Sequence, residues 1–175
     1  MRVNIAISER LERISDKLLD RGAQLDDVLT EHEVSSFEDK HGITLPDVYR
    51  EFLLFIGNGG DGPPHYGCPK LGDVADDMMA DERATWTTLP DIAKPFPFTK
   101  SWVWEGDEES DEGKPDQINH GSLYVGNDGC GQYWQLIVTG AERGKVWQFC
   151  GEGLAPTNPK RDFLQWYEDW LDGVE

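Results

Sequence analysis

The sequence predicts a single α+β domain over residues 1–175, in which a mainly antiparallel, twisted sheet is packed by amino-terminal helices and by a C-terminal aromatic-rich helix. Two periodicities carry this prediction. In the first third of the chain and again at its end, apolar residues recur at the three- and four-residue spacing of a helix. Between residues 122 and 149 the pattern changes to the alternation that is typical of strands. A length of 175 residues is also usual for one domain.

The composition indicates a folded chain with an aromatic core. Apolar residues make up 38% of the sequence, and seven Trp, seven Phe and five Tyr supply large side chains. The first residues contain no apolar segment followed by a cleavage site, and no apolar run reaches the roughly 18 residues of a membrane span. The three cysteines are an odd number, which indicates reduced thiols and not a disulfide framework. We therefore expect a cytoplasmic protein that does not contact membranes.

The charge balance points to the class of partner. The chain has 34 acidic and 16 basic residues, so its formal net charge is −18. Phosphate backbones are repelled by such a surface, which argues against direct binding of nucleic acid. A basic protein would be attracted, and its association would be accelerated by long-range steering. The alternative is that the charge only keeps the protein soluble, since net charge affects solubility and association and not the fold.

Two amphipathic helices are predicted before residue 43. The first follows Ser8 and ends near Gly22, with apolar residues at positions 11, 14 and 18 on one face. The second begins at Thr30, where Glu33 completes a capping box, and ends at Gly42. Each helix therefore has one face for the core.

The third helix carries a wide apolar stripe and is expected to lie at the centre of the core. Pro46 stands in its first turn and Gly57 ends it. The two glycines of the following Asn-Gly-Gly run allow a sharp reversal, because glycine adopts positive φ at little steric cost. The stripe consists of Leu45, Val48, Tyr49, Phe52, Phe55 and Ile56.

The stretch from residue 30 to residue 60 combines a glutamate-rich helix, a Gly-Ile-x-Leu-Pro turn, Asp-x-Tyr-Arg-x-Phe-Leu and a closing Asn-Gly-Gly. This pattern resembles the amino-terminal signature of the SUKH superfamily, which includes yeast cell-wall synthesis regulators and many bacterial immunity proteins. The later strands and the final helix fit the superfamily more loosely. The matching residues are Glu33, Phe37, Gly42, Leu45, Pro46, Tyr49, Phe52, Leu53, Asn58, Gly59 and Gly60.

The middle of the chain, from residue 61 to residue 116, is interrupted by prolines and is expected to be rich in loops. A short helix over residues 74–86 and a short strand over residues 101–104 are predicted inside it. In residues 105–116, seven of twelve residues are acidic, so this segment is expected to be an exposed acidic loop. Its register does not fit a calcium loop, because Asn119 would stand where the closing carboxylate is required.

Three strands are predicted over residues 122–125, 132–138 and 145–149, with a Gly-rich turn at residues 126–131. In the central strand, residues 134, 136 and 138 share one face and residues 133, 135 and 137 share the other. The last helix is expected to start near Asn158-Pro159 and to lie on the sheet. Its aromatic stripe is Phe163, Trp166, Tyr167 and Trp170.

Neither catalysis nor a cofactor is predicted. Cys130 has His120 and Asp128 nearby in sequence, but no nucleophile motif surrounds it, and a triad is recognised by geometry. His65 and Cys68 have a spacing that two metal ligands could share, yet no second pair completes a zinc signature. We therefore expect no enzyme activity, no metal site and no cofactor.

The resemblance implies a non-catalytic binding protein, since bacterial SUKH members neutralise a cognate toxin domain, often a nuclease. A nuclease cleft is basic because it attracts nucleic acid, so an acidic surface could occupy it. The rival hypothesis, implied by the yeast members, is a regulatory scaffold that binds several cellular partners. The expected contact residues are the acidic groups Asp107, Glu108, Glu109, Asp111 and Glu112, a second patch of Asp73, Asp76 and Asp77, and the aromatic anchors Trp102 and Trp104.

Overall fold

A computed structural model describes residues 5–73, 92–103, 117–150 and 153–174. The helix expected over residues 74–86 and the acidic loop at residues 105–116 lie outside this part of the chain. The described residues form the helices α1 (Ile5–Arg21), α2 (Glu31–His41), α3 (Asp47–Phe55) and α5 (Phe163–Asp172), and the strands β1 (Trp102–Val103), β2 (Ser122–Gly129), β3 (Gln132–Ile137), β4 (Val146–Cys150) and β5 (Gly153–Pro156).

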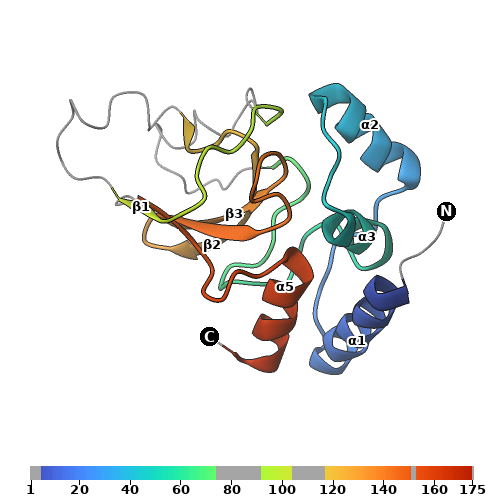
Figure 1. Cartoon of the computed structure of the whole chain (residues 1–175). Helices are drawn as coiled ribbons and strands as arrows, with labels where there is room; N and C mark the ends of the chain where they lie inside the picture. Colours follow the sequence, from blue (N-terminus) through green and yellow to red (C-terminus); the bar gives the residue numbers. More distant parts are fainter. Residues whose placement is uncertain (1–4, 74–91, 104–116, 151–152, 175) are drawn as a thin grey trace, which may run out of the picture.

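The five strands form one sheet in the order β1-β5-β4-β3-β2, and every neighbouring pair is antiparallel. In Figure 1, α1, α2 and α3 gather on one side of the sheet, and α5 runs beside both α1 and the strands. The predicted α+β class is therefore confirmed, as is the packing of the sheet by amino-terminal and C-terminal helices.

The boundaries of α2 follow from the local signals in the sequence. The Thr30 hydroxyl oxygen accepts a hydrogen bond from the Glu33 backbone N–H at 3.3 Å, and the Glu33 carboxylate accepts one from the Thr30 N–H at 2.7 Å. This capping box satisfies donors that the first helical turn leaves unpaired. At the other end, Gly42 adopts a left-handed conformation with φ of 65°. Both predicted ends of this helix are confirmed.

Aromatic rings from α3 and α5 meet in the core on the helical side of the sheet. The Phe163 ring lies 4.6 Å from the Tyr49 ring and 5.1 Å from the Phe52 ring, measured between centroids. Tyr167 lies 4.8 Å from Phe52, and its hydroxyl donates to the Asp61 carbonyl at 2.5 Å. The third helix therefore packs in the core through Tyr49 and Phe52, and the C-terminal stripe packs inward, as predicted; Phe55, which the predicted stripe of the third helix includes, is instead 59% exposed at the end of α3.

A second apolar cluster covers the other face of the sheet. Tyr133 and Ile137 of β3 belong to it, whereas Leu136 and the partly buried Trp134 belong to the cluster on the helical side. The alternation predicted for the central strand is thus correct. Because both faces are covered, Trp147 of β4 is fully buried in the second cluster.

Helix α1 begins at Ile5, one turn earlier than the predicted start after Ser8, because Ile7 extends its buried stripe. Polar contacts fasten this helix to α5. The Arg10 guanidinium donates to the Asp162 carboxylate at 3.1 Å and to the Glu168 carboxylate at 2.8 Å. Asp162 is also the N-cap of α5, since its side chain accepts from the Gln165 N–H at 2.7 Å.

We expect Arg10→Ala to lower the free energy of unfolding by about 1–2 kcal/mol near neutral pH. Burial on its own would raise the pKa of Asp162, but hydrogen bonds from Arg10 and Gln165 outweigh it, and the pKa lies below the ordinary aspartate range. A carboxyl group with a lowered folded pKa stabilises the fold above its unfolded pKa, and this contribution is lost as pH falls through the folded value.

The difference between wild type and Arg10→Ala should therefore shrink at about pH 3, as measured by urea unfolding. Arg13→Ala is the matched control: it is on the same helix, but its side chain is 57% exposed and 3.4 Å from Glu168. It should cost at most about 1 kcal/mol. An Arg10→Ala deficit that is the same at both pH values would contradict this role of Asp162.

Candidate partner-binding site

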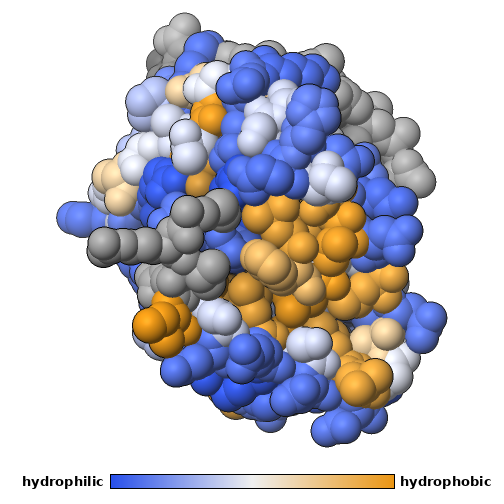
Figure 2. Space-filling view, turned by 90° about the vertical axis from the view of Figure 1, so that its right-hand side faces the viewer, coloured by the Kyte–Doolittle hydropathy of each residue, from blue (hydrophilic) through white to orange (hydrophobic). Residues whose placement is uncertain are grey.

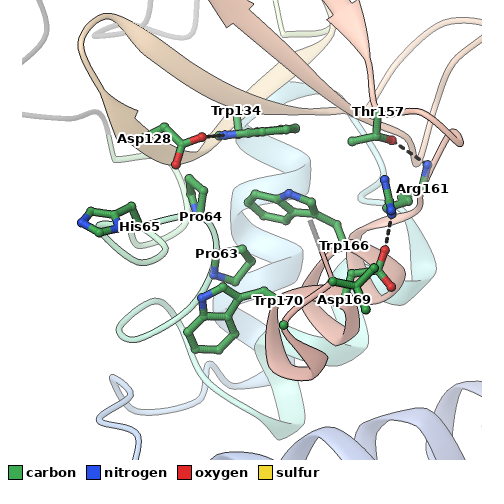
Figure 3. A pocket seen from close by; sticks show the side chains of 12 residues that line it. Pro63, Pro64, His65, Asp128, Trp134, Thr157, Arg161, Trp166, Asp169 and Trp170 are labelled. Carbon is green, nitrogen blue, oxygen red and sulfur yellow. Dashed lines mark hydrogen bonds and ion pairs between the residues drawn. The ribbon is translucent and has the colours of Figure 1, made fainter.

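A pocket of about 530 Å³ opens where the β2–β3 hairpin, the loop after α3 and helix α5 meet (Figure 3). Its walls combine aromatic and apolar side chains with polar and charged ones. Trp134 comes from β3, Trp166 and Trp170 come from α5, and Pro63 and Pro64 come from the loop. We call the space between these five residues the tryptophan pocket.

Hydrogen bonding and ring contact hold the indoles in place. Trp134 Nε1 donates to Asp128 Oδ2 at 3.1 Å, across the β2–β3 hairpin. The Trp134 ring lies 5.5 Å from the Trp166 ring, with 37° between the ring planes. Trp170 follows one helical turn after Trp166 and has the Arg21 guanidinium 5.2 Å from its centroid. These contacts restrict the rotamers of the indoles before any ligand binds.

The hairpin that carries Trp134 and Asp128 differs from the predicted one. Strand β2 runs on to Gly129, since irregularities between Tyr124 and Gly126 and between Asn127 and Gly129 absorb the extra residues. The turn is therefore only two residues long, and Cys130 adopts φ of 54° there. The Gly-rich segment predicted as a turn at residues 126–131 is mostly strand.

Gly126 allows the proline loop to lie against β2. A Cβ atom at this position would lie 2.5 Å from Pro64 Cδ, 3.0 Å from the Pro63 carbonyl oxygen and 3.2 Å from the Trp166 ring. Contacts this short require the loop or the indole to move. The absence of a side chain at residue 126 therefore permits one wall of the tryptophan pocket to form.

We expect Gly126→Ala to destabilise the protein by about 1–3 kcal/mol, because overpacking displaces Pro64 or Trp166. Chemical denaturation followed by tryptophan fluorescence measures the change. Gln132→Ala, at an exposed position of the same hairpin, serves as the control and should be nearly neutral. If the Gly126 variant matched the control in stability, the close packing of the loop on β2 would be disproved.

Of the charged groups that line the pocket, Arg161 is paired with an opposite charge and, among the described residues, Asp128 is not. Arg161 forms an ion pair with Asp169, and its backbone N–H donates to the Thr157 hydroxyl at 2.7 Å. Asp128 uses Oδ2 for the Trp134 indole, and its Oδ1 has no hydrogen-bond partner among the described residues. One uncompensated carboxylate therefore borders the aromatic walls.

Of the contact residues predicted from the sequence, the structure describes two. Asp73 is exposed, and Trp102 is half-buried in β1, where its ring lies 5.6 Å from Phe98. Strand β1 is at the opposite sheet edge from β2, so Trp102 is not brought to the tryptophan pocket. The other predicted contacts lie outside the described residues: Asp76, Asp77, Trp104, Asp107, Glu108, Glu109, Asp111 and Glu112.

Cys130 and His120, the pair considered for catalysis, are not brought together. His120 precedes the first residue of β2 and Cys130 follows its last, so the length of the strand, more than about 20 Å, separates them. Burial raises the pKa of the Cys68 thiol, which lies near the Pro63 carbonyl at 3.4 Å. Within the described ranges, no three His, Cys, Asp or Glu side chains converge where a metal ion could be held.

Apolar surface also gathers on the side formed by α1–α3, where Figure 2 shows it bordered by hydrophilic surface. Phe55 of α3 is 59% exposed, and Val48 and Leu54 of the same helix are partly exposed. Acidic side chains on α1 point to solvent, including Asp16 and Asp20. An apolar patch with a polar rim is typical of a surface that contacts another molecule. No described helix is both long and apolar enough to cross a membrane.

Comparison with known proteins identifies the family. The sequence model of the SMI1 / KNR4 family (SUKH-1) matches residues 28–172, which include α2, α3, α5 and all the strands. The resemblance inferred from residues 30–60 is thereby confirmed. No curated protein and no solved structure matches the chain. Helix α1 precedes the matched residues, although it packs on α5.

Proposed function

The chain belongs to the SMI1 / KNR4 family (SUKH-1), and we propose that it is a non-catalytic immunity protein that binds and neutralises a cognate bacterial toxin domain. The net charge of −18 is the observation that carries this proposal. It favours a basic partner, and a nuclease is the toxin class whose cleft is basic by necessity. The protein acts in the cytoplasm of the cell that it protects, where the toxin would reach its nucleic acid.

Internal ion pairing leaves the net negative charge on exposed side chains. Arg10, Arg50 and Arg161 each pair with acidic side chains of the chain itself. Each pair neutralises an acid as well as a base, so the net charge of −18 remains, and acidic side chains such as Asp16, Asp20 and Asp73 are exposed. The potential seen by a partner is accordingly negative, which raises the association rate of a basic domain.

The acidic loop at residues 105–116 is the proposed first contact, with residues 73, 76 and 77 as a second acidic patch and Trp102 and Trp104 as anchors. Reversing Asp107, Glu109 and Asp111 to Lys should slow association with the toxin roughly tenfold and flatten its salt dependence. Stopped-flow association rates at several salt concentrations measure both effects.

A control variant with the same change in net charge shows whether the position of the reversed residues matters or only the total charge of the protein. Reversal of the exposed acids Glu9, Asp16 and Asp20 on α1 removes as much negative charge at a different place. Its effect on the association rate should be clearly smaller. If the two triple variants slowed association equally, the loop would contribute only to the overall field.

The partner is found by affinity capture of the intact protein from its native cells, with washes at low and then high salt. A single stoichiometric basic toxin domain that survives the high-salt wash, and whose toxicity is abolished by the protein, supports the immunity function. Several substoichiometric proteins that are lost together at high salt support a regulatory scaffold instead. A captured toxin that stays active in the complex contradicts neutralisation.

A further inference from the structure

We propose that the tryptophan pocket binds an arginine side chain of the protein partner. This inference deepens the proposed function, because it names the chemistry by which a basic partner would be held at one defined place. It concerns the pocket itself and does not depend on the partner being a toxin.

The walls of the pocket suit a planar cation. Guanidinium groups stack on indole faces, where the ring quadrupole attracts the cation and the weak hydration of the group lowers the cost of removing water. The Trp134 ring packs on the Trp166 ring at 37°; Trp134 is partly exposed and Trp166 is 6% exposed, and Pro63 and Pro64 lie beside them as apolar lining (Figure 3). The aliphatic part of an arginine would pack there, as such stems do on apolar surface.

A contact of this kind already exists among the described residues. The Arg21 guanidinium lies 5.2 Å from the Trp170 centroid and, together with Trp170, His65 and Asp61, lines a neighbouring cavity of about 330 Å³. Trp170 therefore contributes to both cavities. An intramolecular guanidinium therefore already makes a cation–π contact with one of the indoles that line the pocket, in the neighbouring cavity.

Charge decides between a cation and a neutral apolar group. Asp128 Oδ2 accepts from Trp134 Nε1, which leaves Oδ1 as an acceptor at the mouth of the pocket. Arg161 does not cancel this charge, because it is paired with Asp169. A guanidinium has several N–H donors in a fixed plane, so it can donate to the carboxylate while it stacks on the rings. The volume of about 530 Å³ is within the usual range of ligand pockets and leaves room for a long side chain.

The test uses blocked arginine, N-acetyl-arginine methylamide, and its neutral counterpart N-acetyl-citrulline methylamide, which has nearly the same shape. Each is titrated into the full chain while the indole N–H signals are followed by NMR, with Trp134→Phe assigning one signal. We expect saturable shifts of the Trp134 and Trp166 signals with arginine and at least fivefold weaker binding of citrulline. Equal binding of the two probes would overturn the proposal, because it would leave only an apolar pocket.

Two variants that each remove one negative charge test whether Asp128 is part of the binding site. Asp128→Asn should weaken arginine binding by about fivefold to tenfold, whereas Asp73→Asn, an exposed acid elsewhere, should leave it unchanged. Equal weakening in both variants would show a general charge effect and overturn the site. The comparison of arginine with citrulline needs only the wild-type protein, so it stands even if Asp128→Asn perturbs the hairpin.

The outcomes separate this inference from the proposed function. Arginine binding in the pocket, with no toxin recovered by affinity capture, would support the arginine site and contradict the immunity function. The opposite result is a toxin that the protein neutralises with an affinity unchanged by Asp128→Asn, together with no binding of the arginine probe. It would support the immunity function and contradict the arginine site.

Discussion

A chain that ends at Pro159 is expected to lose its cooperative unfolding transition. Helix α5 supplies five buried side chains to the core on the helical side of the sheet, and their burial is worth on the order of 10 kcal/mol. This is comparable to the whole stability of a typical domain. The truncation also removes the acids that fasten α1 through Arg10. The lost core residues are Phe163, Leu164, Trp166, Tyr167 and Leu171.

Circular dichroism during heating and size-exclusion chromatography measure the outcome. The truncated chain should be aggregated or should melt without a sigmoidal transition. A chain that ends at Gly173 is the control, since it keeps the whole helix and its C-cap and lacks only two residues beyond it. A soluble, monomeric product with a cooperative melt after removal of α5 would show that the helix is not part of the core.

The elements with strong local signals could be predicted from the sequence. Helix α2 is bounded by a capping box and by Gly42, and both interactions are made within a few residues of chain. The faces of β3 follow from strict alternation, because one face meets the helices and the other meets the second cluster. In both cases the residue that carries the signal also makes the contact.

Elements that depend on distant partners were missed or misplaced. Strand β5 is four residues long, contains Gly153 and Pro156, and exists because it pairs with β4 and β1. The sequence predicts a start of α5 near Asn158-Pro159, whereas Asp162 caps the helix, and the Arg161 backbone N–H donates to the Thr157 hydroxyl. No local pattern distinguishes these alternatives, since each proline or aspartate could begin a helix.

The tryptophan pocket illustrates what sequence reasoning leaves out. The sequence predicts that Trp134 shares a strand face with residues 136 and 138 and that Trp166 belongs to the packed stripe of its helix, and the structure confirms both. These indoles come together with Pro63 and Pro64 only in the folded chain, because about a hundred residues separate the proline loop from Trp166. The sequence predicts Gly126 in a turn, so it gives no signal of this contact; the structure places Gly126 inside β2, where a glycine often marks the close approach of another segment.

Phe163→Ala is expected to cost about 3–5 kcal/mol, which is the second-largest effect predicted for this protein. The ring is 1% exposed and lies between Tyr49 and Phe52 of α3, with Tyr167 on its own helix 6.1 Å away. Close-packed rings on three sides cannot collapse to fill the space, so the substitution leaves a cavity. The melting temperature should fall by about 10 °C.

Gln165→Ala tests whether the effect arises from the core or from the helix. Gln165 is exposed on the same turn, and among the described residues its side chain donates to Asp169 at 2.9 Å, so its loss should cost about a few tenths of a kcal/mol. Phe163→Leu, which keeps most of the apolar volume, should recover much of the stability lost in the alanine variant. Equal melting temperatures of the Phe163→Ala and Phe163→Leu variants would show that the apolar volume at residue 163 does not stabilise the packing of α5 against α3.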